Sequence, residues 1–520
     1  MDPMKQWQEA ERLAGSEGLE QTRAAYEALL EDRTLAPYAH LRLSMADQRA
    51  GNVRGATGHA LQAFAKAYSD AGLLEMLCKL LLRLGEVRAA LACANALAQA
   101  NPTAGALAET GKMFSDRMLP DAALPLVQRA MLKGMADAPA MQYLLGLNLM
   151  YAGKLDEALE ALERSVVEDP KLASAHWALA KLGDAATRDK RIDRLRDLLK
   201  TVDEGHQDAP LLWYALFHEL DRDEQRVSAW GALEKAMRLR RRQVPHDDAQ
   251  MDDLYAAATA SIDSYVRVEP QSESSDAAAP VFVVGMPRTG TTVIEQHLCA
   301  HADAASAGEL RDLAVQMRWV TQQPGPYRFD GTLLRVMQAG DAGLLGRRYL
   351  EHTQWCAQGR GFYVDKWPEN HLAIGHILRA LPQARVLVVR RGAADTCFSN
   401  LKEWFAASYY YSYDMLEVAR QYARFDRLMK VVESANSPRV AFVDYEAFVQ
   451  SPAQVVGDLR NTLGLPARAD AGKVGGQGSV ATASSVQIRD GVSARHVDSW
   501  KRYATYLAPM LNALEQSGHC

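Results

Sequence analysis

The sequence predicts a protein of two parts, an all-α solenoid followed by an α/β domain with a central parallel sheet. Three observations support this prediction. A pattern of a glycine, an apolar residue and an alanine recurs in the first half with a period of 34 residues. A β-branched run feeds a glycine loop at residues 281–292. After that loop, short β-branched runs alternate with helical stretches, which is typical of a parallel sheet flanked by helices.

The repeat in the first half is marked by three glycines. Gly51 and Gly85 lie 34 residues apart, and Gly85 and Gly153 lie 68 apart, which is twice that period. Each glycine has an apolar residue two positions on and an alanine five positions on. A period of 34 is that of the tetratricopeptide repeat (TPR), a pair of helices that needs neighbours to bury its apolar faces. We therefore expect a TPR α-solenoid.

The solenoid is expected to occupy residues 1–244, and a helix and linker residues 245–279. The stretch 268–280 lacks periodicity and is rich in serine, alanine and acidic residues, which indicates a linker. The α/β domain is expected at 280–520. Its candidate strands are Val281–Val284, Gly361–Val364, Val386–Val389 and Val440–Val443.

A basic cluster ends the helical part of the sequence. It consists of Arg238, Arg240, Arg241 and Arg242. Four positive charges in a last helical turn complement the helix dipole, so we expect a solvated helix end. The alternative is a docking patch for an acidic partner.

Composition excludes several classes of function. A net charge of −5 over 520 residues gives no reason to expect a nucleic-acid or membrane partner. No stretch approaches the roughly 20 apolar residues that span a bilayer, and the polar N-terminus lacks the apolar run of a signal peptide. The six cysteines form no C-x-x-C pair, so we expect reduced thiols, no metal and a cytoplasmic protein.

The glycine loop has the layout of a phosphate cradle. Gly285 and Gly290 match the spacing G-x-x-x-x-G, and the next helix would point its positive end at an anion. An ATP-binding loop continues with Lys and then Ser or Thr, whereas Thr291 and Thr292 follow here. Arg288 lies inside the loop. These features favour a phosphate or sulfate ester over a magnesium triphosphate.

The loop and the segment Ala307–Leu310 resemble the sulfotransferases that use 3′-phosphoadenosine 5′-phosphosulfate (PAPS). The arginine in the loop resembles the protein-tyrosine branch. With the repeats added, the chain resembles the bacterial TPR sulfotransferases. The resemblance implies a sulfotransferase domain that uses PAPS as co-substrate without a metal. It assigns the 5′-phosphosulfate to six loop residues: Pro287, Arg288, Thr289, Gly290, Thr291 and Thr292.

The same resemblance names three catalytic residues. It makes Glu309 the general base for the acceptor hydroxyl, with Arg288 and Lys366 stabilising charge on the transferring group. The alternatives are that Glu309 charges the first turn of the next helix and that Lys366 is a surface cation. His297 and His301 are rival bases.

The resemblance also implies how the 3′-phosphate is held. It assigns this phosphate to Arg391 and Ser399, although Arg390 is an equally charged competitor and Gly392-Ala393 departs from the family pattern. An arginine suits the role because its planar fork donates two hydrogen bonds to a phosphate. Tyr445 is matched to the adenine side. The segment that closes over the nucleotide is matched by Arg489, Arg495 and Lys501, with His496 of unassigned role.

An aromatic stretch, residues 404–413, follows Ser399. It is expected either to line an acceptor pocket, because ring faces suit a phenol or a sugar, or to pack between helices.

Two classes of acceptor are compatible with the sequence. A TPR groove favours an extended peptide, so we expect a tyrosine of a peptide or protein as acceptor. The alternative is a small metabolite or glycan, with the repeats mediating self-association or holding a carrier protein. Two other classes are a P-loop kinase, disfavoured by the missing lysine after Gly290, and a repeat scaffold with an inactive C-terminal domain, disfavoured by intact Arg288, Glu309 and Lys366.

Overall fold

The computed structural model describes residues 2–14, 19–67, 70–266, 277–468, 482 and 492–519. By its contacts the chain divides into two compact units, each built from several stretches of sequence. The first unit combines Met1–Ala136, Arg311–Arg328 and Ala339–Thr353, and the second combines Asp137–Leu310, Phe329–Gln338 and Gln354–Cys520. Each unit therefore contains both repeat helices and segments from beyond the repeats.

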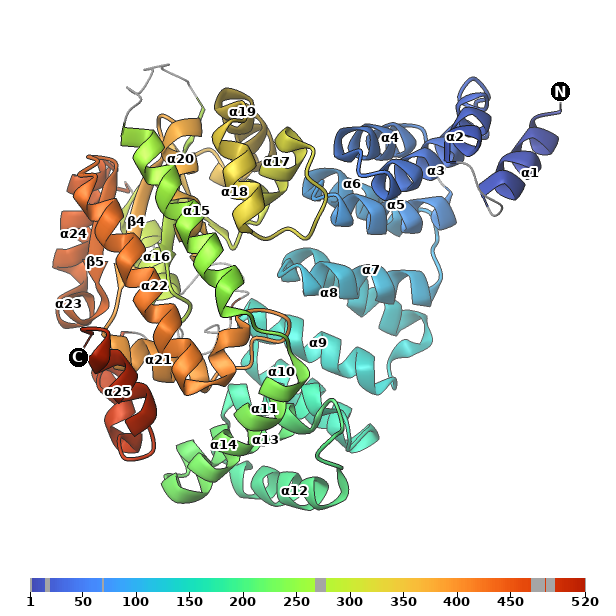
Figure 1. The fold of residues 1–520 in the computed structure, drawn as a ribbon. Helices are drawn as coiled ribbons and strands as arrows, with labels where there is room; N and C mark the ends of the chain where they lie inside the picture. The colour runs from blue at the N-terminus through green and yellow to red at the C-terminus, as the bar shows by residue number, and fades with distance from the viewer. Residues whose placement is uncertain are drawn as a thin grey trace. The chain divides into compact units, whose positions relative to one another are not determined.

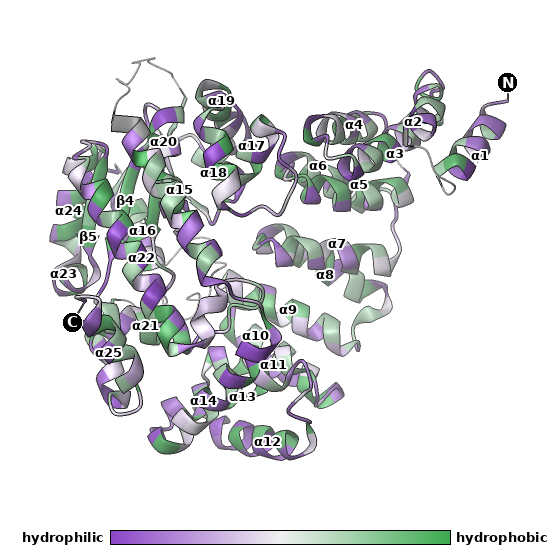
Figure 2. Ribbon diagram, in the orientation of Figure 1, coloured by the Kyte–Doolittle hydropathy of each residue, from purple (hydrophilic) through white to green (hydrophobic). Residues whose placement is uncertain are grey.

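The first unit is built of helix pairs that Figure 1 shows in blue, with one later helix packed on them and a second packed on that one. Figure 2 shows polar and apolar residues alternating along these helices, as expected when one face of each is buried. The helices are α1 (Pro3–Ala14), α2 (Leu19–Glu27), α3 (Ala36–Arg49), α4 (Val53–Ala65), α5 (Ala71–Arg83), α6 (Val87–Gln99), α7 (Ala104–Asp116), α8 (Pro120–Ala130) with the π-helical turn η1 (Met131–Met135), α17 (Asp312–Thr321) and α19 (Ala342–Thr353).

The second unit begins with six further repeat helices and a long connecting helix. These are α9 (Pro139–Ala152), α10 (Leu155–Glu168), α11 (Ala173–Leu182), α12 (Arg188–Thr201), α13 (Ala209–Arg222), α14 (Arg226–Gln243) and α15 (Asp248–Val266). The helices that accompany the sheet are α16 (Thr291–His301), α18 (Gly331–Gln338), η2 (Gln354–Ala357), η3 (Pro368–Ala373), α20 (Ile374–Ala380), α21 (Ala393–Leu401), η4 (Tyr410–Tyr413), α22 (Met415–Ser434), α23 (Tyr445–Gln450), α24 (Pro452–Leu463), η6 (Ala494–His496), η7 (Ser499–Tyr503) and α25 (Ala508–Gln516).

The three repeat glycines have the positions that the period predicted. Gly51, Gly85 and Gly153 have φ angles of 74°, 77° and 80°, and each ends the first helix of a pair. Glycine enters this left-handed region without the strain that a Cβ would bring. The alanines five positions further on, Ala56, Ala90 and Ala158, are fully buried where paired helices meet. The predicted helical-repeat architecture is confirmed.

A five-stranded parallel sheet forms the centre of the α/β part. Its strands lie in the order β2 (Ala304–Gly308), β3 (Phe362–Asp365), β1 (Ala279–Gly285), β4 (Arg385–Arg390) and β5 (Val440–Asp444). Every neighbouring pair is parallel. The four strands expected from the sequence are present. The structure adds β2, whose run of alanine, serine and glycine carries no β-branched signal.

Helices cover both faces of this sheet. Ile294 and Leu298 of α16 pack with Val281 and Val283 of β1 in one buried cluster that α24 completes. Figure 1 shows α15 and α22 crossing the face turned to the viewer. An all-parallel sheet needs such cover because both of its faces are apolar.

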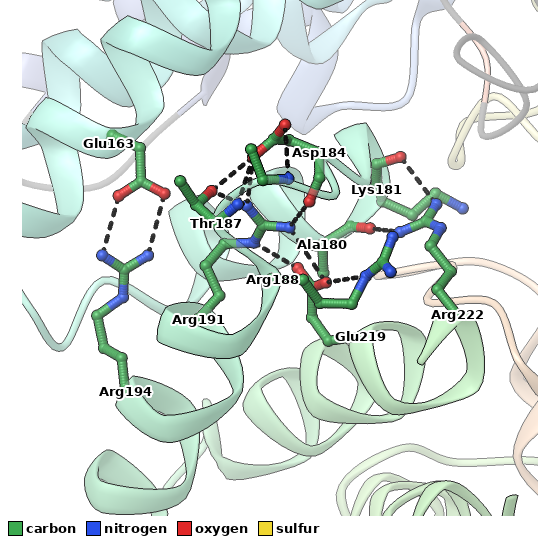
Figure 3. A network of polar contacts seen from close by, with 11 residues as sticks. Glu163, Ala180, Lys181, Asp184, Thr187, Arg188, Arg191, Arg194, Glu219 and Arg222 are labelled. Atoms are coloured by element: carbon green, nitrogen blue, oxygen red, sulfur yellow. Dashed lines mark hydrogen bonds and ion pairs between the residues drawn. The ribbon is translucent and has the colours of Figure 1, made fainter. Parts of the chain in front are cut away.

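A buried polar network joins α11, α12 and α13, as Figure 3 shows. The Arg191 guanidinium donates to Glu219 at 2.6 Å, and the Arg191 and Glu219 side chains are 2% and 0% exposed. Arg222 donates to the main-chain carbonyls of Ala180 and Lys181. These bonds fix the end of α11, which carries Lys181, against α13.

The basic cluster at the end of α14 is only partly solvated. Arg240 stacks 4.4 Å over the Trp404 ring, and Arg241 pairs with Glu417 at 2.8 Å. The expectation of a solvated helix end is therefore wrong for these two arginines. Most of the expected linker, residues 267–276, lies outside the described residues. Among the helices that are described, none has the length and apolarity to cross a membrane.

Candidate active site

The carboxyl ends of all five strands carry the candidate residues. In parallel sheets these ends lie along one edge, where ligands bind. The glycine loop follows β1, Glu309 comes directly after β2, and Lys366 comes directly after β3. Arg391 comes directly after β4, and Tyr445 directly after β5.

The glycine loop is closely packed from two sides. Arg288 and Gly290 have positive φ angles of 70° and 99°, which turn the chain into α16. A Cβ on Gly290 would lie 2.6 Å from Cε2 of Tyr445, and one on Gly285 would lie 2.7 Å from the Val389 carbonyl oxygen. Both glycines are therefore required by space, and the N-terminal end of α16 is available to attract an anion.

Glu309 and Lys366 form an ion pair across two neighbouring strands. Lys366 Nζ donates to Glu309 Oε1 at 2.5 Å, and the Lys366 amide donates to the Gly308 carbonyl at 2.8 Å. The Lys366 side chain is 1% exposed, whereas that of Glu309 is 26% exposed. The carboxylate is thus the accessible member of the pair.

A second carboxyl group lies close to this pair. Glu295 of α16 is buried and accepts a hydrogen bond from Ser306 Oγ at 2.6 Å. Burial raises the pKa of Glu295, and the Lys366 charge opposes that rise. Sequence reasoning missed Glu295 because a single glutamate in a helix carries no motif.

The structure separates the two adjacent arginines. Arg391 is buried, donates to the Arg288 carbonyl at 3.1 Å and stacks 4.8 Å over the Tyr445 ring. Arg390 instead pairs with Glu433 at 2.7 Å and lies 4.2 Å over the Phe442 ring. Arg391 is therefore the arginine that lies beside the glycine loop.

Arg288 shares a carboxylate with a lysine from the repeats. Its Nη1 lies 3.7 Å from Glu403 Oε2, and Lys181 Nζ donates to the same oxygen at 2.8 Å. Burial lowers the pKa of Arg288, and it lowers the pKa of Lys181 to about 8 even though Glu403 opposes the change. Lys181 belongs to α11, so a repeat helix contributes a charge to the surroundings of the loop.

Further basic side chains gather at the same place. Burial lowers the pKa of Lys402 to about 8, and the charges of Arg288 and Arg391 contribute to that shift. Burial also lowers the pKa of His496 to about 4, with Lys402 and Arg495 adding to the effect. These mutual repulsions indicate a positive potential that an anionic ligand would relieve.

The remaining sequence-predicted residues differ in how exposed they are. Ser399 is buried in α21, whose next residue, Asn400, donates to the Pro287 carbonyl at 2.8 Å. Arg495 is exposed and its Nε donates to His496 Nε2 at 3.2 Å. Lys501 is exposed and paired with Asp498. Arg489 lies outside the described residues.

The rival bases differ from Glu309 in their surroundings. His297 hydrogen-bonds the Val293 carbonyl at 2.9 Å and packs edge-on against Phe448, and burial lowers its pKa. His301 is the last residue of α16. Neither shares the Lys366 contact that Glu309 makes.

The aromatic stretch packs largely against helices. Trp404 and Tyr413 contact each other and Tyr214 of α13, and Tyr411 and Tyr413 are buried. Of the two expected roles, packing is the one these contacts support. In the part of the chain that is described, no group of three or more His, Cys, Asp or Glu side chains is arranged to hold a metal ion.

Sequence reasoning also missed Lys181, Lys402 and Glu403. Lys402 and Glu403 lie just after Ser399, so a search of the residues that follow the expected 3′-phosphate serine would have reached them. Lys181 lies 222 residues before Glu403, and nothing in the sequence connects the two.

The comparisons with known proteins agree with this architecture. Residues 280–470 match the model of the sulfotransferase family, so the chain carries a sulfotransferase family domain in its C-terminal half. An uncharacterized protein of Aquifex aeolicus is 25% identical over 382 residues, which is 70% of this chain and 48% of that protein. The chain thus spans about half the length of this relative.

The helical repeats are similar in part to solved TPR structures. MamA from Desulfovibrio magneticus is 20% identical, with a TM-score of 0.28 over 34% of this chain and 99% of that one. A tetratricopeptide repeat protein from Parabacteroides merdae is 15% identical, with a TM-score of 0.32 over 46% and 93%. The C-terminal part of a TPR protein from Cytophaga hutchinsonii is also 15% identical, with a TM-score of 0.34 over 45% and 94%.

Proposed function

We propose that this protein transfers a sulfuryl group from PAPS to a hydroxyl acceptor, and that the preferred acceptor is a tyrosine of a peptide or protein. The observation that carries the proposal is the accessible Glu309 carboxylate paired with buried Lys366, on the same sheet edge as the arginine-bearing glycine loop. The sulfotransferase family domain supports the reaction class.

The residues present fit a nucleotide with phosphates at two ribose positions. The loop Pro287–Thr292 would hold the 5′ side, because its glycines let the backbone approach closely and the N-terminal end of α16 attracts anions. Arg391 and Ser399 would hold the 3′-phosphate, and Tyr445 would lie on the adenine side. The gathering of Arg288, Arg391 and Lys402, whose charges repel one another, supports a polyanionic ligand there.

The proposed chemistry is an in-line displacement at sulfur. The bound nucleotide supplies the sulfuryl group and leaves as adenosine 3′,5′-bisphosphate with the electron pair of the broken S–O bond. Glu309 accepts the proton of the acceptor hydroxyl as the new O–S bond forms. Arg288 and Lys366 place positive charge near the transferring group and the departing oxygen.

The acceptor and the setting of the reaction are part of this proposal. Helical repeats commonly bind extended peptides, which supports a peptide or protein acceptor held by the repeats. Self-association through the same repeats is a second use for them. We propose a cytoplasmic location, in line with six cysteines and no zinc-finger spacing.

Two measurements test the proposal. Calorimetric titration should show binding of adenosine 3′,5′-bisphosphate and much weaker binding of ATP, because only the former carries a 3′-phosphate. Labelled sulfate should then pass from PAPS to tyrosine peptides in preference to small phenols or glycans. Equal affinity for the two nucleotides would refute the PAPS assignment, and preferred transfer to a glycan or small phenol would refute the tyrosine assignment.

A further inference from the structure

We propose that Lys181, a residue of the helical repeats, is a positioning residue for nucleotide binding that keeps Arg288 available by neutralising Glu403. This inference rests on the proposed function, because it assumes that Arg288 faces an anionic nucleotide. It assigns the repeats a part in the sulfotransferase site that is separate from acceptor binding.

The geometry brings three largely buried charges together. Glu403 Oε2 lies 2.8 Å from Lys181 Nζ and 3.7 Å from Arg288 Nη1, so one oxygen serves both cations. The Lys181 and Glu403 side chains are 10% and 4% exposed. A carboxylate this buried needs a close partner, and the lysine is the nearer one.

The charge balance of this trio decides what Arg288 can do. With Arg288 as its sole partner, the Glu403 carboxylate would cancel the arginine charge and draw the guanidinium toward itself. With Lys181 present, the trio keeps one net positive charge. That charge is then available to a phosphate or sulfate oxygen at the loop, where low dielectric strengthens it.

The repeats also hold the chain segment that carries Glu403. Tyr214 and His218 of α13 hydrogen-bond the main-chain carbonyls of Leu401 and Lys402, at 3.0 and 2.9 Å. These carbonyls belong to the C-terminal end of α21, the helix that begins two residues after Arg391. Helix α13 thus holds the segment that carries Glu403 in position, and Lys181 of α11 neutralises the Glu403 carboxylate.

The test is the dissociation constant of adenosine 3′,5′-bisphosphate, measured by calorimetry at low ionic strength on the full chain and its variants. Lys181→Met should weaken binding about tenfold, because Arg288 is then cancelled by Glu403. Lys181→Arg keeps the charge and should stay within about threefold of the wild type. The double variant Lys181→Met/Glu403→Gln removes both charges and should recover most of the lost affinity. Lys200→Met, at an exposed pair of α12, should bind like the wild type.

Thermal unfolding of each variant accompanies the titrations, and Lys181→Gln replaces Lys181→Met if the latter does not fold. Unchanged affinity in a folded Lys181→Met or Lys181→Gln protein overturns the inference and leaves the proposed function standing. The inference is also overturned if Lys181→Met/Glu403→Gln binds the nucleotide as weakly as Lys181→Met does, since a purely structural role of Lys181 predicts no recovery of affinity. A wild-type protein that does not bind the nucleotide overturns both proposals.

Discussion

Two of the lysine–glutamate pairs in the second unit have a nearly buried lysine, and they differ in whether the glutamate reaches solvent. In the pair at the ends of β2 and β3, Lys366 is buried and Glu309 is 26% exposed. In the pair between α11 and the segment after α21, both Lys181 and Glu403 are nearly buried. The first arrangement presents a carboxylate to an incoming group. The second encloses a carboxylate and can act only through its neighbours. The same two residue types therefore suit different roles.

Removing the accessible carboxylate should have the largest effect. Glu309→Gln should lower kcat about 100- to 10,000-fold, the usual worth of a general base, and leave the affinity for adenosine 3′,5′-bisphosphate within about twofold. Glu403→Gln should instead bind the nucleotide at least as tightly as the wild type. Sulfate transfer kinetics and calorimetry on both variants make the comparison. Similar profiles for the two variants would show that the pairs are not distinct.

The scaffold beneath Lys181 can be tested through stability. Arg191→Met leaves Glu219 buried without its main partner and should lower the free energy of unfolding by about 3–5 kcal/mol. Arg194→Met, on the same helix, breaks a half-exposed pair with Glu163 and should cost under about 1 kcal/mol. Figure 3 shows both arginines. Urea unfolding measures the difference, and equal costs would show that burial does not separate the two pairs.

The two adjacent arginines offer a matched test of the anion site. Arg391→Ala should weaken binding of adenosine 3′,5′-bisphosphate about 10- to 100-fold, because charge-assisted hydrogen bonds to a phosphate are lost. Arg390→Ala should change it less than about twofold, since Arg390 faces Glu433. The reverse order, measured by calorimetry, would assign the 3′-phosphate to Arg390.

The smallest expected effect is on the pH dependence of stability. The residue concerned is Asp312, three positions after Glu309. Asp312 begins α17 in the first unit, and burial with the nearby Glu86 raises its pKa to about 7. The folded protein then holds a proton that the unfolded chain loses above about pH 4, so stability falls as the pH rises from about 4 to 7.

In the variant Asp312→Asn, most of the contribution of Asp312 to the fall of stability with pH should be lost. The variant should be about 1–2 kcal/mol more stable than the wild type at pH 8. Burial also raises the pKa of Glu86, so a part of the slope should persist. Thermal unfolding between pH 5 and 8 measures the slope. An unchanged slope would show that Asp312 does not titrate in this window. Asp116→Asn, at an exposed site of α7, is the control.

Much of the site could be predicted because its residues follow strands. Glu309, Lys366, Arg391 and Tyr445 each come directly after a strand, and a parallel sheet brings such positions to one edge. Sequence reasoning missed an element without a β-branched run and a site residue that does not follow a strand. Strand β2 lacks β-branched residues, and Glu295 lies in a helix without a motif.

By itself, the sequence determined the repeat period, the glycine loop and the alternation of strands with helices, because these depend on local spacing and on backbone freedom at glycine. Only the tertiary structure decided which arginine lies beside the loop, and that a lysine from α11 shares a carboxylate with Arg288. Contacts between residues more than 200 positions apart depend on how packed helices meet, and no local pattern records them.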